Sequence, residues 1–98
     1  TTMAYKLIGF AYAGSDNSSY INIQLQAIKN AIPSLETELG DENDSRIQTS
    51  PIPKNKTSYL PLYIVQDGSG NYVGHRTGKF PDKEVLSWLK SSFLSIDG

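Results

Sequence analysis

The hydrophobic pattern opens with a run from Tyr5 to Ala13 that is apolar on both of its alternating faces. A strand that is covered on both sides has this pattern, whereas a half-exposed strand alternates with polar residues. A turn-forming segment follows over residues 14–18, and apolar residues then recur at intervals of four, three and four: Ile21, Leu25, Ile28 and Ile32. This spacing predicts one amphipathic helix that begins near Ser18.

The middle of the chain has a weaker pattern. Because Pro33 cannot donate a helical hydrogen bond, we expect the helix to end or bend near Ala31. A further turn or two is expected over residues 33–39, with Gly40 as the stop. Three segments follow in order: an acidic loop over 41–44, a short strand over 46–49 and a polar, proline-rich stretch over 50–58.

The C-terminal half predicts a hairpin and a helix. Two runs rich in β-branched and aromatic residues, 59–66 and 72–77, flank the sequence Asp-Gly-Ser-Gly-Asn. This pattern is typical of a β-hairpin, and its turn predicts a positive φ at Gly70 or Asn71. Gly78 ends the second strand, and a last helix is expected over residues 81–94, where one face gathers four apolar residues: Val85, Leu86, Leu89 and Phe93.

The predicted order is therefore β-α-β-β-β-α in an α/β fold. The first strand, the long helix and the short second strand form a right-handed βαβ unit, and the hairpin completes a mixed four-stranded sheet with helices on its faces. Ninety-eight residues are enough for one domain, 1–98. Thr1 and Thr2 precede Met3 and are interpreted as residues added by cloning.

Composition excludes several classes of function. The net charge is −1, and lysine and arginine are scattered along the chain without a basic stripe, so nucleic-acid binding is not expected. No stretch approaches the roughly 20 apolar residues that span a bilayer, and the N-terminus does not read as a secretory signal. We therefore expect a cytoplasmic location without membrane attachment. The chain has no cysteine, which excludes thiol and disulfide chemistry.

Three features of the chain together resemble the thioredoxin-like family. The predicted first strand ends in Phe10-Ala-Tyr-Ala-Gly14, and Ser15-Asp-Asn-Ser18 follows where the family has Cys-X-X-Cys at the start of a long helix. Leu60-Pro61 resembles the family's cis-proline at the head of the hairpin. The third feature is the hairpin itself followed by the last helix, with its Trp-Leu-Lys pattern.

The resemblance covers about residues 5–94 and is closest to the glutaredoxin-sized form. It implies a thioredoxin-like fold and a cis peptide bond between Leu60 and Pro61. The sequence departs from the family in two places, because the 50–58 linker is short and proline-rich and both cysteines are missing. The second departure removes the family's chemistry, since a serine hydroxyl is neither ionised near neutral pH nor able to form a mixed disulfide.

Ser15 and Ser18 are therefore expected to cap the helix rather than to catalyse a reaction. The resemblance then favours a non-catalytic domain for protein interaction or assembly, without a cofactor, whose partner is another protein or an extended peptide. The binding surface implied by the family lies at the former active site, with Tyr20 as a further aromatic wall, and comprises these residues: Tyr12, Ser15, Asp16, Asn17, Ser18, Tyr59, Leu60 and Pro61.

Two alternatives stay open at this point. In the first, the natural protein is a thiol-disulfide oxidoreductase or glutaredoxin whose two active-site cysteines are replaced here by Ser15 and Ser18. In the second, it binds glutathione without thiol chemistry. Hydrolysis by a Ser-Asp pair is disfavoured, because the only histidine, His75, is expected to be exposed on the edge hairpin. The acidic residues of the 41–44 loop lack the glycine and final glutamate of a calcium loop.

Overall fold

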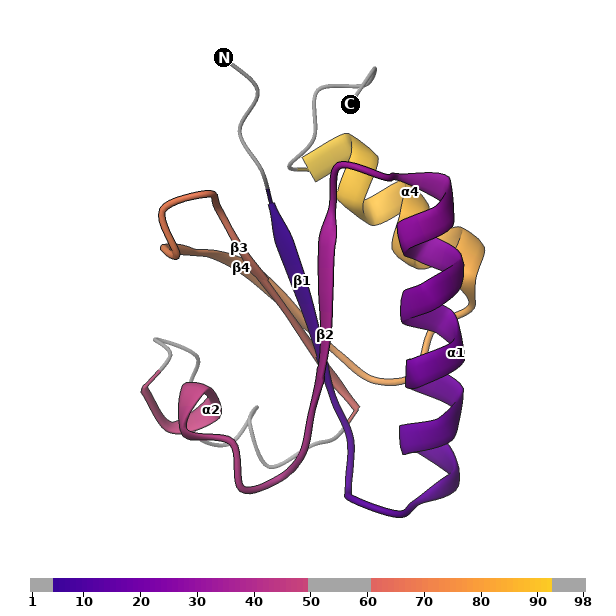
Figure 1. Ribbon diagram of the computed structural model, residues 1–98, viewed down its shortest axis with the longest axis vertical. Coiled ribbons are helices and arrows are strands. Elements are labelled where there is room, and N and C mark those ends of the chain that lie inside the picture. Colours follow the sequence, from indigo (N-terminus) through magenta and orange to yellow (C-terminus); the bar gives the residue numbers. More distant parts are fainter. Residues whose placement is uncertain (1–4, 50–60, 93–98) are drawn as a thin grey trace.

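The computed structural model describes residues 5–49 and 61–92. Figure 1 shows the path of the chain, and its elements run in this order: β1 (Lys6–Phe10), α1 (Asp16–Ala31), β2 (Glu36–Gly40), α2 (Ser45–Thr49), β3 (Leu62–Gln66), β4 (Tyr72–Thr77) and α4 (Asp82–Ser92). Several predictions from the sequence lie outside the described residues: the linker 50–58, Tyr59, Leu60 with its cis peptide bond to Pro61, Phe93 and Leu94.

The four strands form one mixed sheet in the order β2-β1-β3-β4. β1 pairs in parallel with β2 and antiparallel with β3, and β3 pairs antiparallel with β4. The predicted mixed sheet and its hairpin are therefore confirmed. A βαβ unit is also present, but its second strand is formed by residues 36–40 and not by the predicted residues 46–49. β1 is an inner strand, and its residues from Leu7 to Phe10 are fully or almost fully buried, as its two-sided apolar pattern predicts.

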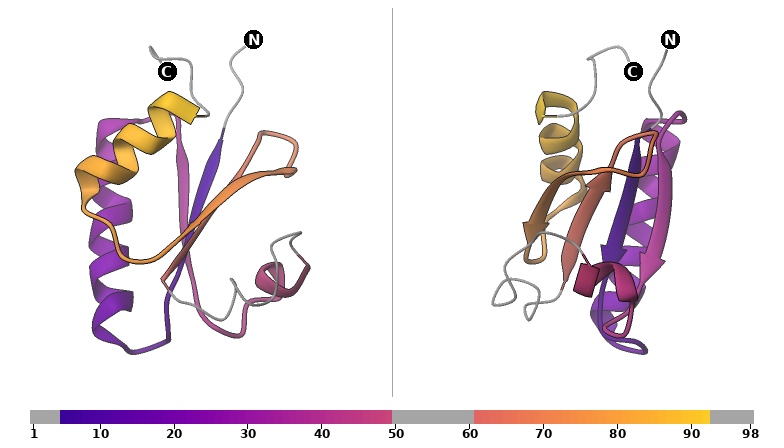
Figure 2. Two further views of the ribbon diagram at one scale, coloured as in Figure 1. Left: turned by 180° about the vertical axis from the view of Figure 1, so that it is seen from behind. Right: turned by 90° about the vertical axis from the view of Figure 1, so that its left-hand side faces the viewer.

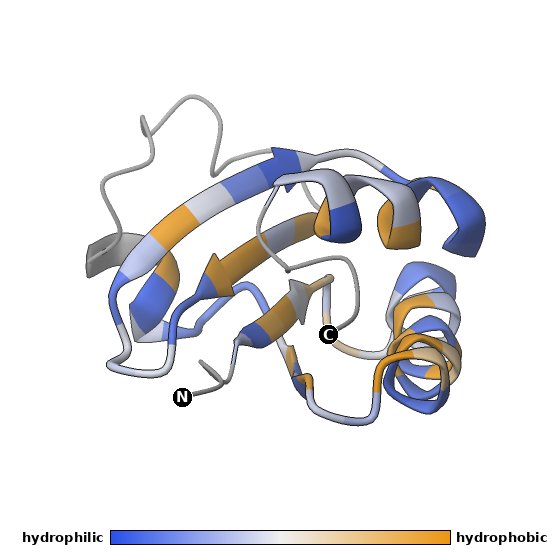
Figure 3. Cartoon of the chain, turned by 90° about the horizontal axis from the view of Figure 1, so that it is seen from above, coloured by the Kyte–Doolittle hydropathy of each residue, from blue (hydrophilic) through white to orange (hydrophobic). Residues whose placement is uncertain are grey.

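The sheet is covered differently on its two faces. Figure 2 shows α1 and α4 together on one face and the short α2 beside the other. The helix-side core joins α1 and α4 to alternate residues of the inner strands, among them Leu7, Tyr63 and Val65. The other face holds a smaller cluster: Ile8, Phe10, Ile47, Leu62 and Ile64. Figure 3 shows that the outer strand β4 is mostly hydrophilic, whereas β3 beside it is hydrophobic.

The second strand lies earlier in the chain than the sequence predicts. Residues 36–40 form strand β2 rather than a helical turn, and residues 46–49 belong to helix α2 rather than to a strand. Pro33 leaves too short a stretch for a stable helix, and pairing with β1 satisfies the backbone instead: the Glu36 N–H donates to the Tyr5 carbonyl at 2.9 Å. The Asp44 carboxylate accepts from the Arg46 N–H at 2.9 Å, so it caps α2.

The long helix and the hairpin follow their local sequence signals. α1 ends at Ala31, and the Ile32 N–H still donates to the Ile28 carbonyl at 2.9 Å. In the hairpin turn, the Asp67 carboxylate accepts from the Ser69 and Asn71 N–H groups at 2.9 and 3.0 Å. Gly70 has a φ of 85°, which confirms the predicted positive φ in this turn.

The last helix begins close to its predicted position. α4 starts at Asp82, directly after Pro81, and the Pro81 carbonyl accepts from the N–H groups of Glu84 and Val85. Val85 and Leu89 are completely buried against the helix-side core, as the predicted apolar face requires. Within residues 5–49 and 61–92, no helix is both long enough and apolar enough to cross a membrane.

Gly9 sets how closely α1 can approach the sheet. A Cβ atom at this position would lie 2.5 Å from the branch methyl Cγ2 of Ile21 and 3.5 Å from a methyl of Leu25. Carbon atoms do not approach to 2.5 Å, so any larger residue must push α1 away from β1. The absence of a side chain at Gly9 therefore keeps the helix-side core closed.

We predict that Gly9→Ala lowers the free energy of unfolding by about 1–3 kcal/mol, because it overpacks the contact between β1 and α1. Urea denaturation followed by circular dichroism measures this loss. The matched control is Gly9→Ala combined with Ile21→Leu, which removes the branch methyl at constant volume and should recover part of the loss. A stable Gly9→Ala variant, or a double variant no more stable than it, would contradict this packing.

Candidate functional site

The turn after β1 and the start of β3 lie at the same edge of the sheet. Because Phe10 pairs with Leu62, the residues after Phe10 and the residue before Leu62 come together at this edge. Pro61 is buried here, and its carbonyl accepts from the Gly78 N–H at 2.8 Å. The register thus places Ala11 opposite Pro61, and the turn that contains Tyr12 and Ser15 follows at this end of the strands.

Ser15 is the N-cap of α1, which confirms the predicted role of this serine. Its Oγ accepts from the Ser18 N–H at 3.1 Å and donates to the Tyr12 carbonyl at 2.6 Å. The helix consequently begins at Asp16, two residues before the predicted start, and Ser18 lies in its first turn rather than at the cap. The Ser15 proton is donated to a backbone carbonyl and not to a base, so the hydroxyl is not activated as a nucleophile in this arrangement.

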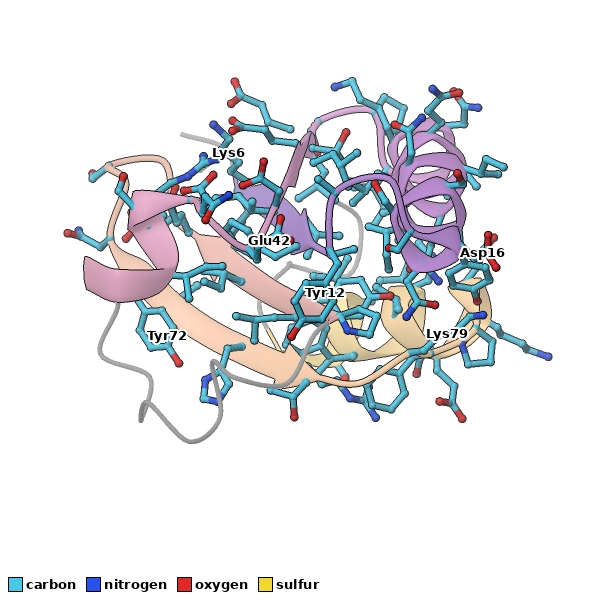
Figure 4. All side chains as sticks on the ribbon, turned by 90° about the horizontal axis from the view of Figure 1, so that it is seen from below. Lys6, Tyr12, Asp16, Glu42, Tyr72 and Lys79 are labelled. Carbon is cyan, nitrogen blue, oxygen red and sulfur yellow. The ribbon has the colours of Figure 1, made fainter. Side chains whose placement is uncertain are left out.

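Tyr12 is the prominent side chain of this edge. It keeps 49% of its surface exposed, although it directly follows the buried residues 7–11. Figure 4 looks onto this edge and labels Tyr12 together with Asp16 and Glu42. The Ala13 N–H donates to the Glu42 carboxylate at 3.2 Å, which joins the turn to the acidic loop after β2. An exposed aromatic ring held by a bonded backbone is suited to contact with a partner.

A hollow of about 310 Å³ lies beside the N-terminus of α1, on the β2 side. Leu39, which is 37% exposed, and Ala13 provide apolar surface in it. Gly40 is required at its base, because a Cβ atom there would lie 2.5 Å from the ring of Phe10. Sequence reasoning missed Leu39, since it assigned residues 33–39 to a helix. The available signal was the alternation of polar and apolar residues in Glu36-Thr-Glu-Leu-Gly40.

The Tyr20 side chain contacts the loop before α4 and does not line the candidate site. Its hydroxyl donates to the Phe80 carbonyl at 2.9 Å, and the Lys79 ammonium lies 4.3 Å from the centre of its ring. Asp16 and Asn17 occupy the first turn of α1, where Asp16 is exposed and Asn17 is half-buried. The two remaining predicted site residues, Tyr59 and Leu60, lie outside the described residues.

An ion-pair cluster links β1, β2 and α2 behind the hollow. Lys6 Nζ lies 2.7 Å from Glu38 Oε1, and the Arg46 guanidinium contacts both Glu38 and Asp44. The Arg46 guanidinium, with Lys6 second, holds the pKa of Glu38 at about 2. Arg46 likewise lowers the pKa of Asp44. Asp44 therefore lines the hollow as a carboxylate whose charge Arg46 already balances.

The structure does not assemble a hydrolytic triad. His75 is half-buried on β4 rather than exposed, because its Nδ1 shares a short hydrogen bond with the Tyr72 hydroxyl and the two rings stack at 5.9 Å. It is on the outer strand β4, whereas Ser15 and Asp16 are at the start of α1. Across the described ranges, no group of three or more histidine or acidic residues is placed to hold a metal ion.

The fold is similar to several solved structures. A designed protein has a TM-score of 0.68 at 18% identity, over 89% of this chain and 78% of that one. The thioredoxin of Fasciola hepatica has a TM-score of 0.67 at 13% identity, over 91% and 81% of the two chains, and that of Trypanosoma brucei brucei has 0.65 at 19%, over 90% and 74%.

No family model matches the sequence, and no curated protein matches it. At identities below one in five, the similarity to these structures shows the fold alone. The thioredoxin-like fold and the four-stranded mixed sheet predicted from the sequence are confirmed.

We predict that Glu38 makes stability depend on pH in acid. Because its pKa falls from an ordinary 4.5 to about 2 on folding, its contribution is complete above about pH 4.5 and is lost as the pH falls towards 2. Glu38→Gln should therefore be less stable than the parent chain at pH 6 and equal to it near pH 2, as measured by urea denaturation across this range.

Glu36→Gln is the matched control, because this glutamate lies on the same strand, is exposed and has no ion-pair partner among the described residues. It should leave the difference between pH 6 and pH 2 nearly unchanged. Parallel stability profiles for Glu38→Gln and the parent chain would contradict the ion-pair assignment.

Proposed function

We propose that this chain, which has a thioredoxin-like fold and no cysteine, is a non-catalytic domain that binds another protein at the edge formed by Tyr12 and Pro61. One observation carries the proposal. The Ser15 hydroxyl caps the helix and donates to the Tyr12 carbonyl, and this bond fixes the backbone that carries a half-exposed aromatic ring. The turn is therefore suited to present Tyr12 rather than a nucleophile.

The partner is proposed to be an extended segment. In the fold resembled here, the residue before the proline at the head of the hairpin pairs with an extended peptide as an added strand. The buried Pro61 fixes the chain at this place, and its carbonyl is already used by Gly78. An apolar side chain of the segment would rest on the Tyr12 ring, with its polar groups towards Asp16 and Asn17. No cofactor is proposed, and the cytoplasmic location stays a prediction.

We predict that Tyr12→Ala weakens binding of such a segment about tenfold or more, since exposed aromatic anchors dominate binding surfaces of this kind. The probe is a peptide obtained by selecting a displayed library of random heptapeptides on the parent chain. Its affinity is then measured by fluorescence anisotropy for the parent chain, Tyr12→Ala and Ile23→Ala.

Ile23→Ala is the matched control, because Ile23 is 69% exposed on α1 and lies outside the Tyr12–Ser18 turn. It should bind the peptide like the parent chain. Selection that yields no peptide, or equal losses for Tyr12→Ala and Ile23→Ala, would overturn the proposal.

The second candidate is an oxidoreductase whose active-site cysteines are replaced here by Ser15 and Ser18. It is supported by their Cys-X-X-Cys spacing at the cap and first turn of α1. The encoding gene, or the intact mass of the natural protein, decides between the two candidates, and serine at both encoded positions ends this one.

We expect the parent chain not to reduce insulin in the presence of dithiothreitol, because it lacks a sulfur nucleophile. Titration calorimetry with glutathione tests the third, glutathione-binding alternative.

A further inference from the structure

Arg76, on the outer strand β4, has hydrogen-bond donors that the described fold does not use. Its guanidinium carbon lies 3.9 Å from the centre of the Phe80 ring and 5.8 Å from that of Trp88. Among residues 5–49 and 61–92, no carboxylate forms an ion pair with it and no acceptor takes its N–H groups. The stacking holds the planar group in one orientation, so little side-chain entropy remains to be lost on binding.

The guanidinium opens onto a hollow of about 360 Å³ between β4 and α4. Besides Arg76, its lining comes from one side of α4: Glu84, Ser87, Trp88 and Ser91. Trp88 gives this hollow an aromatic wall, and the serines give it a polar one. It lies apart from Tyr12, since it is built on α4 and on Arg76 of β4.

β4 is the last strand of the sheet, and no described strand pairs with its outer side. A segment added there would run about 4.8 Å away, and its side chains would stand about 5 Å from those of β4 on the same face. Arg76 pairs with Tyr63, whose side chain belongs to the helix-side core, so Arg76 also faces the helices. A residue opposite Arg76 would therefore lie over the hollow.

We propose that β4 binds an extended segment of a partner protein that places an aspartate or glutamate opposite Arg76. The planar fork of arginine matches a carboxylate with two parallel hydrogen bonds. β4 itself carries no acidic residue, and Lys79 follows it closely, so the strand is complementary to an acidic segment. Glu84 lines the same hollow, and its negative charge repels a doubly charged phosphate more strongly than a singly charged carboxylate.

A second copy of the chain fits this surface less well. The other outer strand, β2, carries Glu36 and Glu38. Glu38 pairs with Ile8, which belongs to the cluster on the α2 side of the sheet, and Glu36 lies two residues away on the same face. On the helix side, β2 presents Thr37 and Leu39. A copy that continued the sheet with its helices on the same side would therefore place no carboxylate opposite Arg76.

The test uses the full chain labelled with ¹⁵N and two synthetic peptides, acetyl-Thr-Val-Glu-Val-Thr-amide and its glutamine counterpart. We expect the glutamate peptide to shift the backbone amides of β4 and the Nε resonance of Arg76, and to bind about tenfold more tightly than the glutamine peptide. Arg76→Gln should abolish this preference, and Arg76→Lys should keep only part of it, since lysine retains the charge but loses the fork.

Lys90→Gln is the matched control, because it removes one positive charge from an exposed position on α4 that does not line the hollow. It should keep the tenfold preference. Equal affinity for the two peptides, a preference that survives Arg76→Gln, or shifts confined to β2 or to the Tyr12 edge would overturn the proposal. So would competition by equimolar inorganic phosphate, or concentration-dependent self-association through β4 in the free chain. Tyr12→Ala should bind both peptides normally, which separates this surface from the proposed function.

Discussion

A buried glutamine is the constraint on which the helix side of this structure depends. Gln24 is 1% exposed, and burying an amide is costly unless its groups are bonded. Its Oε1 accepts from the Tyr63 hydroxyl, and its Nε2 donates to the Phe80 carbonyl at 2.6 Å. Burial raises the pKa of Tyr63, which keeps that hydroxyl a donor. The chain of bonds thus fixes the sheet, α1 and the loop that leads into α4 relative to one another.

Both proposed binding surfaces are held by this arrangement. The Phe80 carbonyl also accepts from Tyr20, one turn before Gln24, so two residues of α1 bind the same carbonyl of the loop. The ring of Phe80 on that loop is the platform on which the Arg76 guanidinium stacks. At the start of the same helix, the Ser15 cap holds Tyr12 at the edge of the sheet. α1 therefore positions Tyr12 through the Ser15 cap and, through Phe80, the Arg76 guanidinium on β4.

Local signals in the sequence predicted most of the fold. The apolar spacing of α1, the stop at Pro33 and the turn at Gly70 each act within a few residues, and each was confirmed. β2 was misplaced because Glu36–Gly40 becomes a strand only by pairing with β1, a contact that local propensity does not contain. The exposure of Leu39 and the stacking of Arg76 depend on that tertiary arrangement and were not predicted. Gln24 had a signal, since it falls on the apolar face between Ile21 and Leu25.

The most direct test of this account is a double-mutant cycle on the buried pair, measured as the free energy of unfolding in urea. Gln24→Leu leaves the Tyr63 hydroxyl without an acceptor and removes one of the two donors to the Phe80 carbonyl. It should lower the free energy of unfolding by about 1–3 kcal/mol. Adding Tyr63→Phe removes the stranded hydroxyl, so the double variant should be more stable than the sum of the single losses allows. Additive losses, or a Gln24→Leu variant as stable as the parent chain, would show that the fold does not depend on this hydrogen-bonded glutamine.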